Sequence, residues 1–220
     1  MRSKLFYGDD YLRIEKEIRD LLNSQPDFLS ARTASSTRAT GDAIQEVLAD
    51  NFRTLLGEAC KEYSADFARR AMADLAFQDT DDIYYVVDVK THRKEEGFHM
   101  PNLTSVERLA RFYEDDMNCF VVLTVSYRIA GTKVTAEDVH FVPIEFLSWR
   151  CLTIGALGWG QIQIANSDVI EVLPGYSRRK WMLELCERLF EFYPSEISKI
   201  HRRIERFQKV KEYWENKKET

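Results

Sequence analysis

Hydrophobic residues follow two different periods along the chain, and the first part has the period of a helix. Apolar side chains recur every three or four residues over 9–23, so we expect an amphipathic helix there, ended by Pro26. Residues 30–40 are small, hydroxylated and basic and lack an apolar period, which predicts a loop that ends at Gly41. A second helix is expected over about 42–56.

From residue 72 the pattern changes to short runs rich in β-branched and aromatic residues. Residues 72–77 and 83–90 are separated by the polar stretch 78–82, which predicts a β-hairpin. The long apolar run over 119–129 has the composition of a strand at the centre of a buried sheet. The middle of the chain is therefore expected to form a sheet.

A polar loop and a helix are expected between the hairpin and this long strand. The loop covers residues 91–102. The hydroxyl of Thr104 or Ser105 can then accept from the free N–H groups of a helix that runs to about Asp115.

The C-terminal part is expected to hold two shorter strands and two helices. The strands are predicted near 138–143 and 161–165. The helices are predicted over about 178–192 and 195–216, because Pro194 interrupts the helical pattern between them.

Composition and element order together predict one domain over residues 1–220. A content of 45% hydrophobic residues is enough for one sizeable core. The order of elements is that of an α/β fold with a mixed central sheet flanked by helices. No run of about 18 apolar residues occurs and the N-terminus lacks an apolar export signal, so we expect a cytoplasmic protein without a membrane partner. The four cysteines are far apart, which predicts buried thiols: Cys60, Cys119, Cys151 and Cys186.

Charge is unevenly distributed. The net charge is -5, which by itself argues against a nucleic-acid partner, because phosphate neutralisation needs Lys and Arg. Residues 178–220, however, contain 12 Lys/Arg against 8 Asp/Glu, a balance of +4 that leaves -9 for the rest of the chain. An acidic body with basic segments suits an enzyme that gathers carboxylates around metal ions and contacts DNA elsewhere.

Three charged residues of the predicted hairpin carry the candidate chemistry. Side chains alternate between the faces of a strand, so Asp88 and Lys90 point the same way, and the hairpin can bring Asp74 beside them. Two carboxylates can hold Mg²⁺ and leave positions for water and phosphate oxygen. Lys90 can orient or deprotonate an attacking water. An Asp-x-Lys triplet also occurs as a plain ion pair at the end of a strand.

The stretch Asp74 followed by Asp88-Val89-Lys90-Thr91 resembles the PD-(D/E)xK signature of the restriction-endonuclease superfamily, with Ala73 where the signature has proline. Within it, residues 30 to 215 resemble the HincII-like, EcoRV-related enzymes. The resemblance includes Pro101-Asn102, at the same spacing from Asp88 as in HincII, and Gln161-Ile162-Gln163 on a late strand. His99-Met100 and the passage Gly155 to Gly160 differ from HincII, so the DNA sequence recognised does not carry over.

The resemblance implies a prokaryotic type II restriction endonuclease that cuts double-stranded DNA with Mg²⁺, at a short palindromic site, leaving blunt ends with 5′-phosphates. It implies metal ligands at Asp74 and Asp88, a catalytic lysine at Lys90, and a further acidic residue at Glu46, although Gln45 occupies the usual position. It also implies a homodimer, since two-fold symmetric subunits match symmetric half-sites, and a DNA methyltransferase in the same system. The expected DNA contacts are Arg32, Arg38, His92, Arg93, Lys94, His99, Met100, Asn102, Gly155, Trp159, Gln161, Gln163, Arg178, Arg179 and Lys180.

Several of these contacts have a structural alternative. His92 to Lys94 suit either DNA phosphate or solvent, and Asn102 suits either a base edge or a helix cap. His99 and Met100 suit either a wedge between bases or loop packing. Trp159 suits either a groove contact or a core position. For the whole protein, the alternatives are a structure-specific or non-specific nuclease and a non-catalytic DNA-binding domain.

Overall fold

The computed structural model describes residues 3–25, 28–64, 74–96 and 100–218. They fall into two compact units, residues 1–176 and residues 177–220. The first unit contains two sheets and the second contains the long C-terminal helix. The chain is thus of the mixed α/β class, as the sequence predicted.

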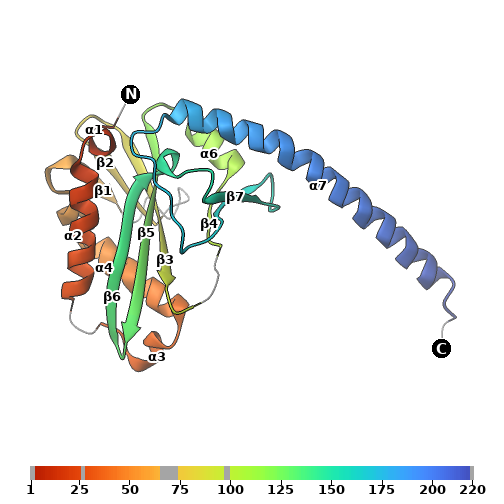
Figure 1. The fold of residues 1–220 in the computed structure, drawn as a ribbon, viewed down its shortest axis with the longest axis horizontal. Coiled ribbons are helices and arrows are strands. Elements are labelled where there is room, and N and C mark those ends of the chain that lie inside the picture. The colour runs from red at the N-terminus through yellow and green to blue at the C-terminus, as the bar shows by residue number, and fades with distance from the viewer. Residues whose placement is uncertain (1–2, 26–27, 65–73, 97–99, 219–220) are drawn as a thin grey trace. The chain divides into compact units, whose positions relative to one another are not determined.

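The larger sheet of the first unit is mixed (Figure 1). Its strands lie in the order β1-β2-β3-β5-β6. Neighbours are antiparallel except for β3 and β5, which run parallel. The strands are β1 (Cys60–Ser64), β2 (Leu75–Asp79), β3 (Tyr84–Arg93), β5 (Asn118–Ala130) and β6 (Lys133–Pro143).

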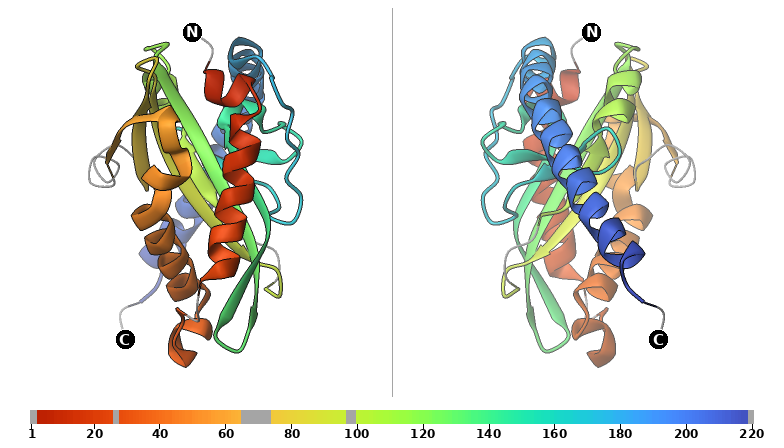
Figure 2. Two further views of the ribbon diagram at one scale, coloured as in Figure 1. Left: turned by 90° about the vertical axis from the view of Figure 1, so that its left-hand side faces the viewer. Right: turned by 90° about the vertical axis from the view of Figure 1, so that its right-hand side faces the viewer.

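A smaller antiparallel sheet has the order β4-β8-β7. Its strands are β4 (Asn102–Ser105), β7 (Leu152–Gly155) and β8 (Gln161–Ile164). Among the described residues, the helices of the first unit are α1 (Lys4–Tyr7), α2 (Asp10–Ser24), α3 (Ala31–Ala34), α4 (Thr37–Leu56) and α6 (Val106–Phe112), with 3₁₀ turns η1 (Gly57–Ala59) and η2 (Ile144–Phe146). Helices α2 and α4 contact each other and cover one face of the larger sheet (Figure 2).

Aromatic side chains fill the space between these helices and the sheet. The rings of Phe77 and Tyr85 stack across β2 and β3 with centroids 4.4 Å apart. Phe141 of β6 lies 5.7 Å from Phe52 of α4 and 5.2 Å from Phe6 of α1. Each such pair contributes about 0.5–1.5 kcal/mol beyond the burial of its area. Because Tyr85 of β3 lies in this aromatic cluster and side chains alternate along a strand, the odd-numbered residues of β3 face the helices.

The predicted hairpin and the long strand are confirmed as β2 with β3 and as β5, although β2 continues to Asp79, into the predicted turn. Residues 72–73 of the predicted first strand lie outside the described residues. The helix expected over 9–23 is confirmed as α2, and Ser105 caps α6 by accepting from the Arg108 N–H at 3.2 Å. The loop expected over 91–102 was wrong at its start, because β3 continues to Arg93. Strands β1, β4 and β7 were not predicted, since they are only four or five residues long and partly polar.

The loop expected over 30–40 was also wrong, because this segment forms α3 and the first turn of α4. Its serines act as helix caps: Ser30 accepts from the Thr33 N–H at 3.1 Å and Ser36 from the Ala39 N–H at 3.3 Å. Gly41 is therefore not a helix start but a buried position within α4. A Cβ added there would lie 2.7 Å from Thr91 Oγ1, so the glycine lets α4 approach β3 closely.

The two C-terminal helices predicted around Pro194 are one continuous helix, α7 (Arg178–Glu215). A proline inside a helix removes one hydrogen bond and crowds the carbonyl four residues earlier, at a cost of about 3 kcal/mol. Good helix formers (Leu, Glu, Arg, Lys and Gln) are frequent in the turns further from Pro194, over 183–191 and 199–212, and Ser198 Oγ donates to the Pro194 carbonyl at 3.0 Å. The thiol prediction was wrong for Cys186, which is exposed on this helix, and Cys60 is only half-buried.

Among the residues that the structure describes, no helix has the length and apolar content needed to cross a membrane.

Glu15 of α2 provides a test of the packing between this helix and β6. Its carboxylate accepts from the Phe141 N–H at 2.8 Å, and burial raises its pKa to about 7, against the opposing effects of that hydrogen bond and of Arg19. Because the pKa of the Glu15 carboxyl is higher in the folded protein than in the unfolded chain, its contribution to the free energy of unfolding is greatest below the unfolded pKa. This contribution is lost as the pH rises through about 7. Glu15→Gln should therefore raise the free energy of unfolding at pH 8 by about 1–2 kcal/mol, after allowance for partial exposure.

Urea unfolding at pH 8 and at pH 5 measures this effect, and most of the gain should disappear at pH 5. Glu17→Gln is the matched control on the same helix, because Glu17 forms only an exposed pair with Arg13. Equal changes in the two variants, or a gain that does not depend on pH, would show that burial of Glu15 does not cost stability.

Candidate active site

The β2–β3 hairpin places Asp74 beside Asp88. Leu75 and Val87 are paired in the hairpin register, and the Asp74 N–H donates to the Val87 carbonyl at 3.0 Å. The Asp74 carboxylate in turn accepts from the Val89 N–H at 2.7 Å. The side chain of Asp74 is therefore fixed against the backbone of the Asp88 to Lys90 stretch, as the hairpin predicted.

Asp88 and Lys90 form an ion pair on the face of β3 that points away from α4. Lys90 Nζ donates to Asp88 Oδ1 at 2.7 Å. Asp88 is only 5% exposed, and its Oδ2 atom has no hydrogen-bond partner in the described part of the chain. Burial raises the pKa of Asp88 to about 7 and the Asp74 charge adds to this, while the Lys90 ammonium opposes it. The single ammonium therefore does not compensate the carboxylate fully.

This geometry fits a cation held by two carboxylates. A buried carboxylate oxygen without a partner is costly, and a cation beside it would remove that cost. The described residues contain no cluster of three or more His, Cys, Asp or Glu side chains suited to a metal ion. Mg²⁺ is commonly held by one or two carboxylates, with water and phosphate oxygen filling the other positions. The residues that would hold it are Asp74 and Asp88.

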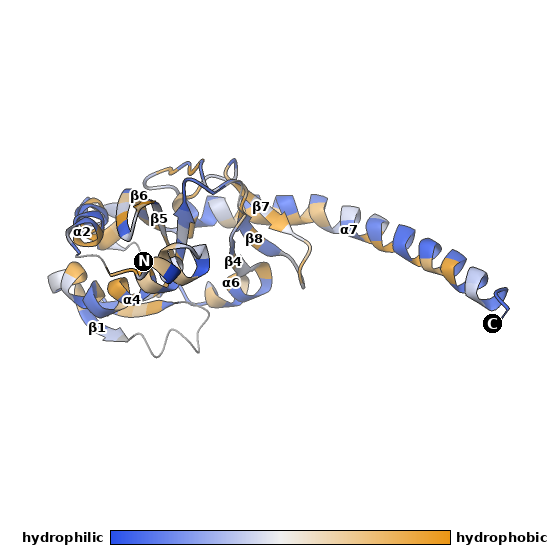
Figure 3. Cartoon of the chain, turned by 90° about the horizontal axis from the view of Figure 1, so that it is seen from below, coloured by the Kyte–Doolittle hydropathy of each residue, from blue (hydrophilic) through white to orange (hydrophobic). Residues whose placement is uncertain are grey.

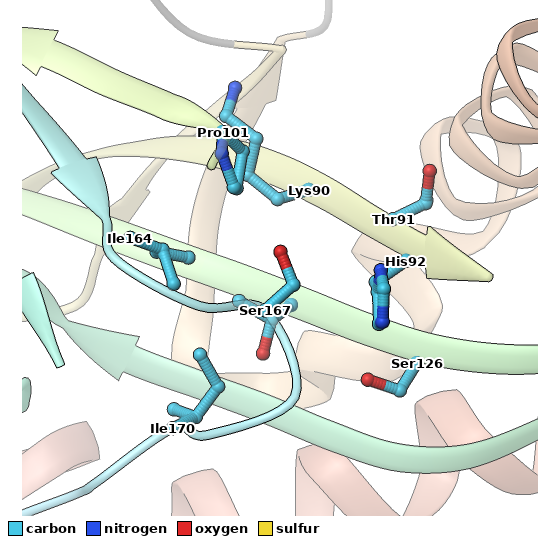
Figure 4. A pocket seen from close by; sticks show the side chains of 9 residues that line it. Lys90, Thr91, His92, Pro101, Ser126, Ile164, Ser167 and Ile170 are labelled. Atoms are coloured by element: carbon cyan, nitrogen blue, oxygen red, sulfur yellow. The ribbon is translucent and has the colours of Figure 1, made fainter. Parts of the chain in front are cut away.

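A small pocket of about 10 Å³ lies beside Lys90, with room for about one water molecule (Figure 4). His92 lines it and continues the Asp88–Lys90 face of β3. His92 is buried, and its Nε2 lies 2.8 Å from Oδ1 of Asp168. The sequence reasoning missed Asp168, and no signal near it in the sequence indicates that it meets β3.

The basic residues after His92 have partners within the first unit. Arg93 Nη1 donates to the Ala34 carbonyl at 3.0 Å, which ties α3 to the end of β3. Lys94 pairs with Asp138 at 2.6 Å and Glu137 at 3.0 Å. These side chains are thus not merely solvated, and a DNA phosphate would compete with carboxylates for Lys94.

Glu46 is not brought to the candidate site. It is exposed on α4, whereas Gln45 faces the sheet and its Nε2 donates to the Val89 carbonyl at 3.2 Å. Successive residues of a helix are about 100° apart, so only one of the two can reach β3. Gln45 is the residue of this turn that supports the Asp88–Lys90 backbone.

The smaller sheet brings together the polar residues predicted to read DNA. Asn102 and Gln163 are paired in the β4–β8 register, and Gln163 Nε2 donates to Asn102 Oδ1 at 2.6 Å. A Cβ on Gly155 would lie 2.6 Å from Gln163 Oε1, so a side chain at this position would displace the Gln163 amide. Asn102 does not cap α6, because Ser105 does. Gln161 is half-buried on β8, and both Met100 and Trp159 are exposed.

The remaining predicted DNA contacts are not part of the smaller sheet. Arg32 and Arg38 are exposed on α3 and α4. Arg178, Arg179 and Lys180 form the first turn of α7 in the second unit, and Arg179 and Lys180 are exposed. His99 lies outside the described residues.

Comparison with protein families finds no family model that matches this chain, and comparison with curated proteins finds no significant match.

Proposed function

We propose that the chain is a Mg²⁺-dependent DNA endonuclease of the type II restriction class, with a fold of the restriction-endonuclease type. The observation that carries the proposal is the buried Asp88 carboxylate, which lies beside Lys90 and Asp74 and has one oxygen without a hydrogen-bond partner among the residues that the structure describes. A plain ion pair at a strand end is exposed and satisfied by water. In this pair Asp88 is buried, and its Oδ2 atom has no hydrogen-bond partner among the described residues.

Each of the three residues has a role in phosphodiester hydrolysis. Asp74 and Asp88 would hold Mg²⁺, which offsets negative charge at the reacting phosphate and lowers the pKa of bound water. Lys90 is already directed at this point by its bond to Asp88, so it can orient the attacking water and stabilise charge on the phosphate. The water attacks phosphorus, the P–O3′ bond breaks, and the products carry a 5′-phosphate and a 3′-hydroxyl.

The restriction class is favoured over a non-specific nuclease by the amide side chains of the smaller sheet. Asn and Gln amides pair with base edges in the major groove, whereas binding without sequence preference relies on Lys and Arg contacts to phosphate. Asn102, Gln161 and Gln163 lie next to one another on β4 and β8. We place base reading there, and phosphate contact at exposed cations such as Arg32 and Arg38.

Digestion of a plasmid of known sequence tests the proposal. We expect discrete bands with Mg²⁺, no cleavage with EDTA, and ends that share one short palindrome and ligate without treatment because they carry 5′-phosphates. A smear would overturn the restriction class and leave a structure-specific or non-specific nuclease. Intact plasmid with both Mg²⁺ and Mn²⁺ would overturn nuclease activity, and the chain would then be a non-catalytic DNA-binding domain.

A further inference from the structure

Helix α7 of the second unit has a heptad repeat that continues for 32 residues. From residue 183 to residue 214, positions a and d alternate at spacings of three and four. Most of them are large and apolar. The a positions are Leu183, Phe190, Ile197, Ile204 and Lys211, and the d positions are Cys186, Tyr193, Ile200, Phe207 and Trp214. A hydrophobic repeat of 3.5 residues is the pattern of a coiled coil.

These a and d side chains are exposed on the helix. The eight large apolar ones are between 37% and 69% exposed, and Cys186 is exposed as well. From typical side-chain areas, they present on the order of 800 Å² of surface, which equals one partner's share of a standard protein interface. Apolar patches of this size on one face of a helix mark interaction sites.

Positions b and f of α7 are mostly charged, and its buried residues, Trp181 and Leu185, lie near its start and outside the a/d stripe. Position b is acidic in four of five heptads and position f is basic in three of four. The b residues are Glu184, Glu191, Ser198, Glu205 and Glu212, and the f residues are Arg188, Ser195, Arg202 and Lys209. Figure 3 shows the resulting mixture of hydrophilic and hydrophobic residues along the whole of α7. A helix of this kind needs a single partner that covers its a/d stripe.

We propose that this partner is α7 of a second copy of the chain, and that the two helices form an antiparallel coiled coil. The orientation follows from charge. When the two-fold axis of the antiparallel pair passes between Ser198 and Lys199, Ile197 packs against Ile200 of the partner subunit. Each of the ten a and d positions then packs against an a or d position of the partner helix. Glu196 at position g then lies opposite Arg203 of the partner subunit, and symmetry makes this pair twice.

A parallel pair does not use these charges. It would place the Lys211 ammonium against its own copy in the core, which is repulsive. It would also place Glu196 opposite His201 and Arg203 opposite Gln208, so no pair of formal charges forms at neutral pH. The antiparallel pair instead places Lys211 beside Cys186 at the end of the overlap. Glu196 already bonds to Lys199 of its own helix at 2.6 Å, but Lys199 is exposed, so water weakens this pair and it can be exchanged.

This inference does not depend on the proposed nuclease activity, because it concerns assembly and is tested without DNA. It goes beyond the expectation of a homodimer, because it assigns the interface to α7. It also gives the basic C-terminal segment a role other than DNA contact.

Sedimentation equilibrium of the full chain at micromolar concentrations is the test. We expect wild type to have twice the chain mass of 25.8 kDa. Ile200→Asp buries a carboxylate in the a/d stripe and should weaken dimerisation by about 100-fold or more. Ser198→Asp makes the same charge change at an outer position two residues away and should leave the dimer intact. A monomeric wild type, or equal dimerisation of the two variants, would overturn the proposal.

Two further measurements keep the test independent of folding defects and report the orientation. Glu196→Arg should weaken the dimer, and adding Arg203→Glu to it should restore the dimer, since the swap recreates the pair with reversed signs. Under mild oxidation Lys211→Cys should form a disulfide with Cys186 of the partner subunit. Rapid disulfide formation between the two Cys186 residues in wild type, or no rescue by the double variant, would overturn the antiparallel arrangement.

Discussion

Replacing Asp88 by asparagine is expected to lower the rate of DNA cleavage by roughly 10³-fold or more while leaving the protein as stable as wild type or more so. Loss of a metal ligand removes several kcal/mol of transition-state stabilisation, and each 1.4 kcal/mol is about tenfold in rate. Stability should not fall, because the native carboxylate is buried, one of its oxygens is unpaired within the described part of the chain, and burial raises its pKa. Single-turnover cleavage and thermal unfolding measure the two effects.

The opposite signs of these effects separate a functional role from a structural one. If the Asp88–Lys90 pair existed only to hold β3 in place, Asp88→Asn would lower the melting temperature and affect cleavage only through unfolding. Asp116→Asn is the matched control, because Asp116 is exposed after α6 and both properties should stay unchanged. DNA binding measured without Mg²⁺ should be retained by Asp88→Asn. Cleavage within tenfold of wild type would rule out Asp88 as a metal ligand.

The part of the site that the sequence predicted is the part determined by local periodicity. Asp88 and Lys90 share a face because side chains alternate along any strand. Asp74 joins them because a short polar turn between two β-rich runs leaves little freedom in the pairing of a hairpin. The bond between the Asp74 carboxylate and the Val89 N–H follows from that register.

The part that could not be predicted depends on contacts between residues far apart in the sequence. His92 pairs with Asp168, 76 residues away, through a segment without helical or strand pattern. The sequence does not show whether Gln45 or Glu46 of α4 reaches the sheet. The close approach of Gly41 to Thr91 sets the rotation of that helix, and it selects Gln45. Helix α7 differs again: a proline usually interrupts a helix, which predicts two helices, but α7 is continuous through Pro194.

Replacing Asp79 by alanine is expected to lower the free energy of unfolding by about 3–5 kcal/mol, although Asp79 is not part of the candidate site. Asp79 is buried at the hairpin turn, and its Oδ1 accepts from the Asp81 and Ile83 N–H groups at 2.9 Å each. Its Oδ2 accepts from the Tyr85 hydroxyl at 2.6 Å, and burial followed by this bond raises the Tyr85 pKa. Alanine leaves the Asp81 and Ile83 N–H groups without their acceptor, at about 1–3 kcal/mol each, and also removes the bond from Tyr85.

The consequence for the site is that Asp79 fixes the turn from which the pairing of Leu75 with Val87, and hence the position of Asp74, follows. At 220 residues, 1 kcal/mol shifts the melting temperature by about 2–4 °C, so Asp79→Ala should melt about 10 °C lower. Asp79→Asn keeps the Oδ1 acceptor, and Tyr85 can still donate to Ser3 Oγ, 2.7 Å away, so its loss should be only about 1 kcal/mol. If the two variants melted together near wild type, the side chain of Asp79 would not hold the hairpin. Residual cleavage by folded Asp79→Ala, measured well below its melting temperature, should also be reduced, because a loosened turn frees Asp74 from the backbone of Asp88 to Lys90.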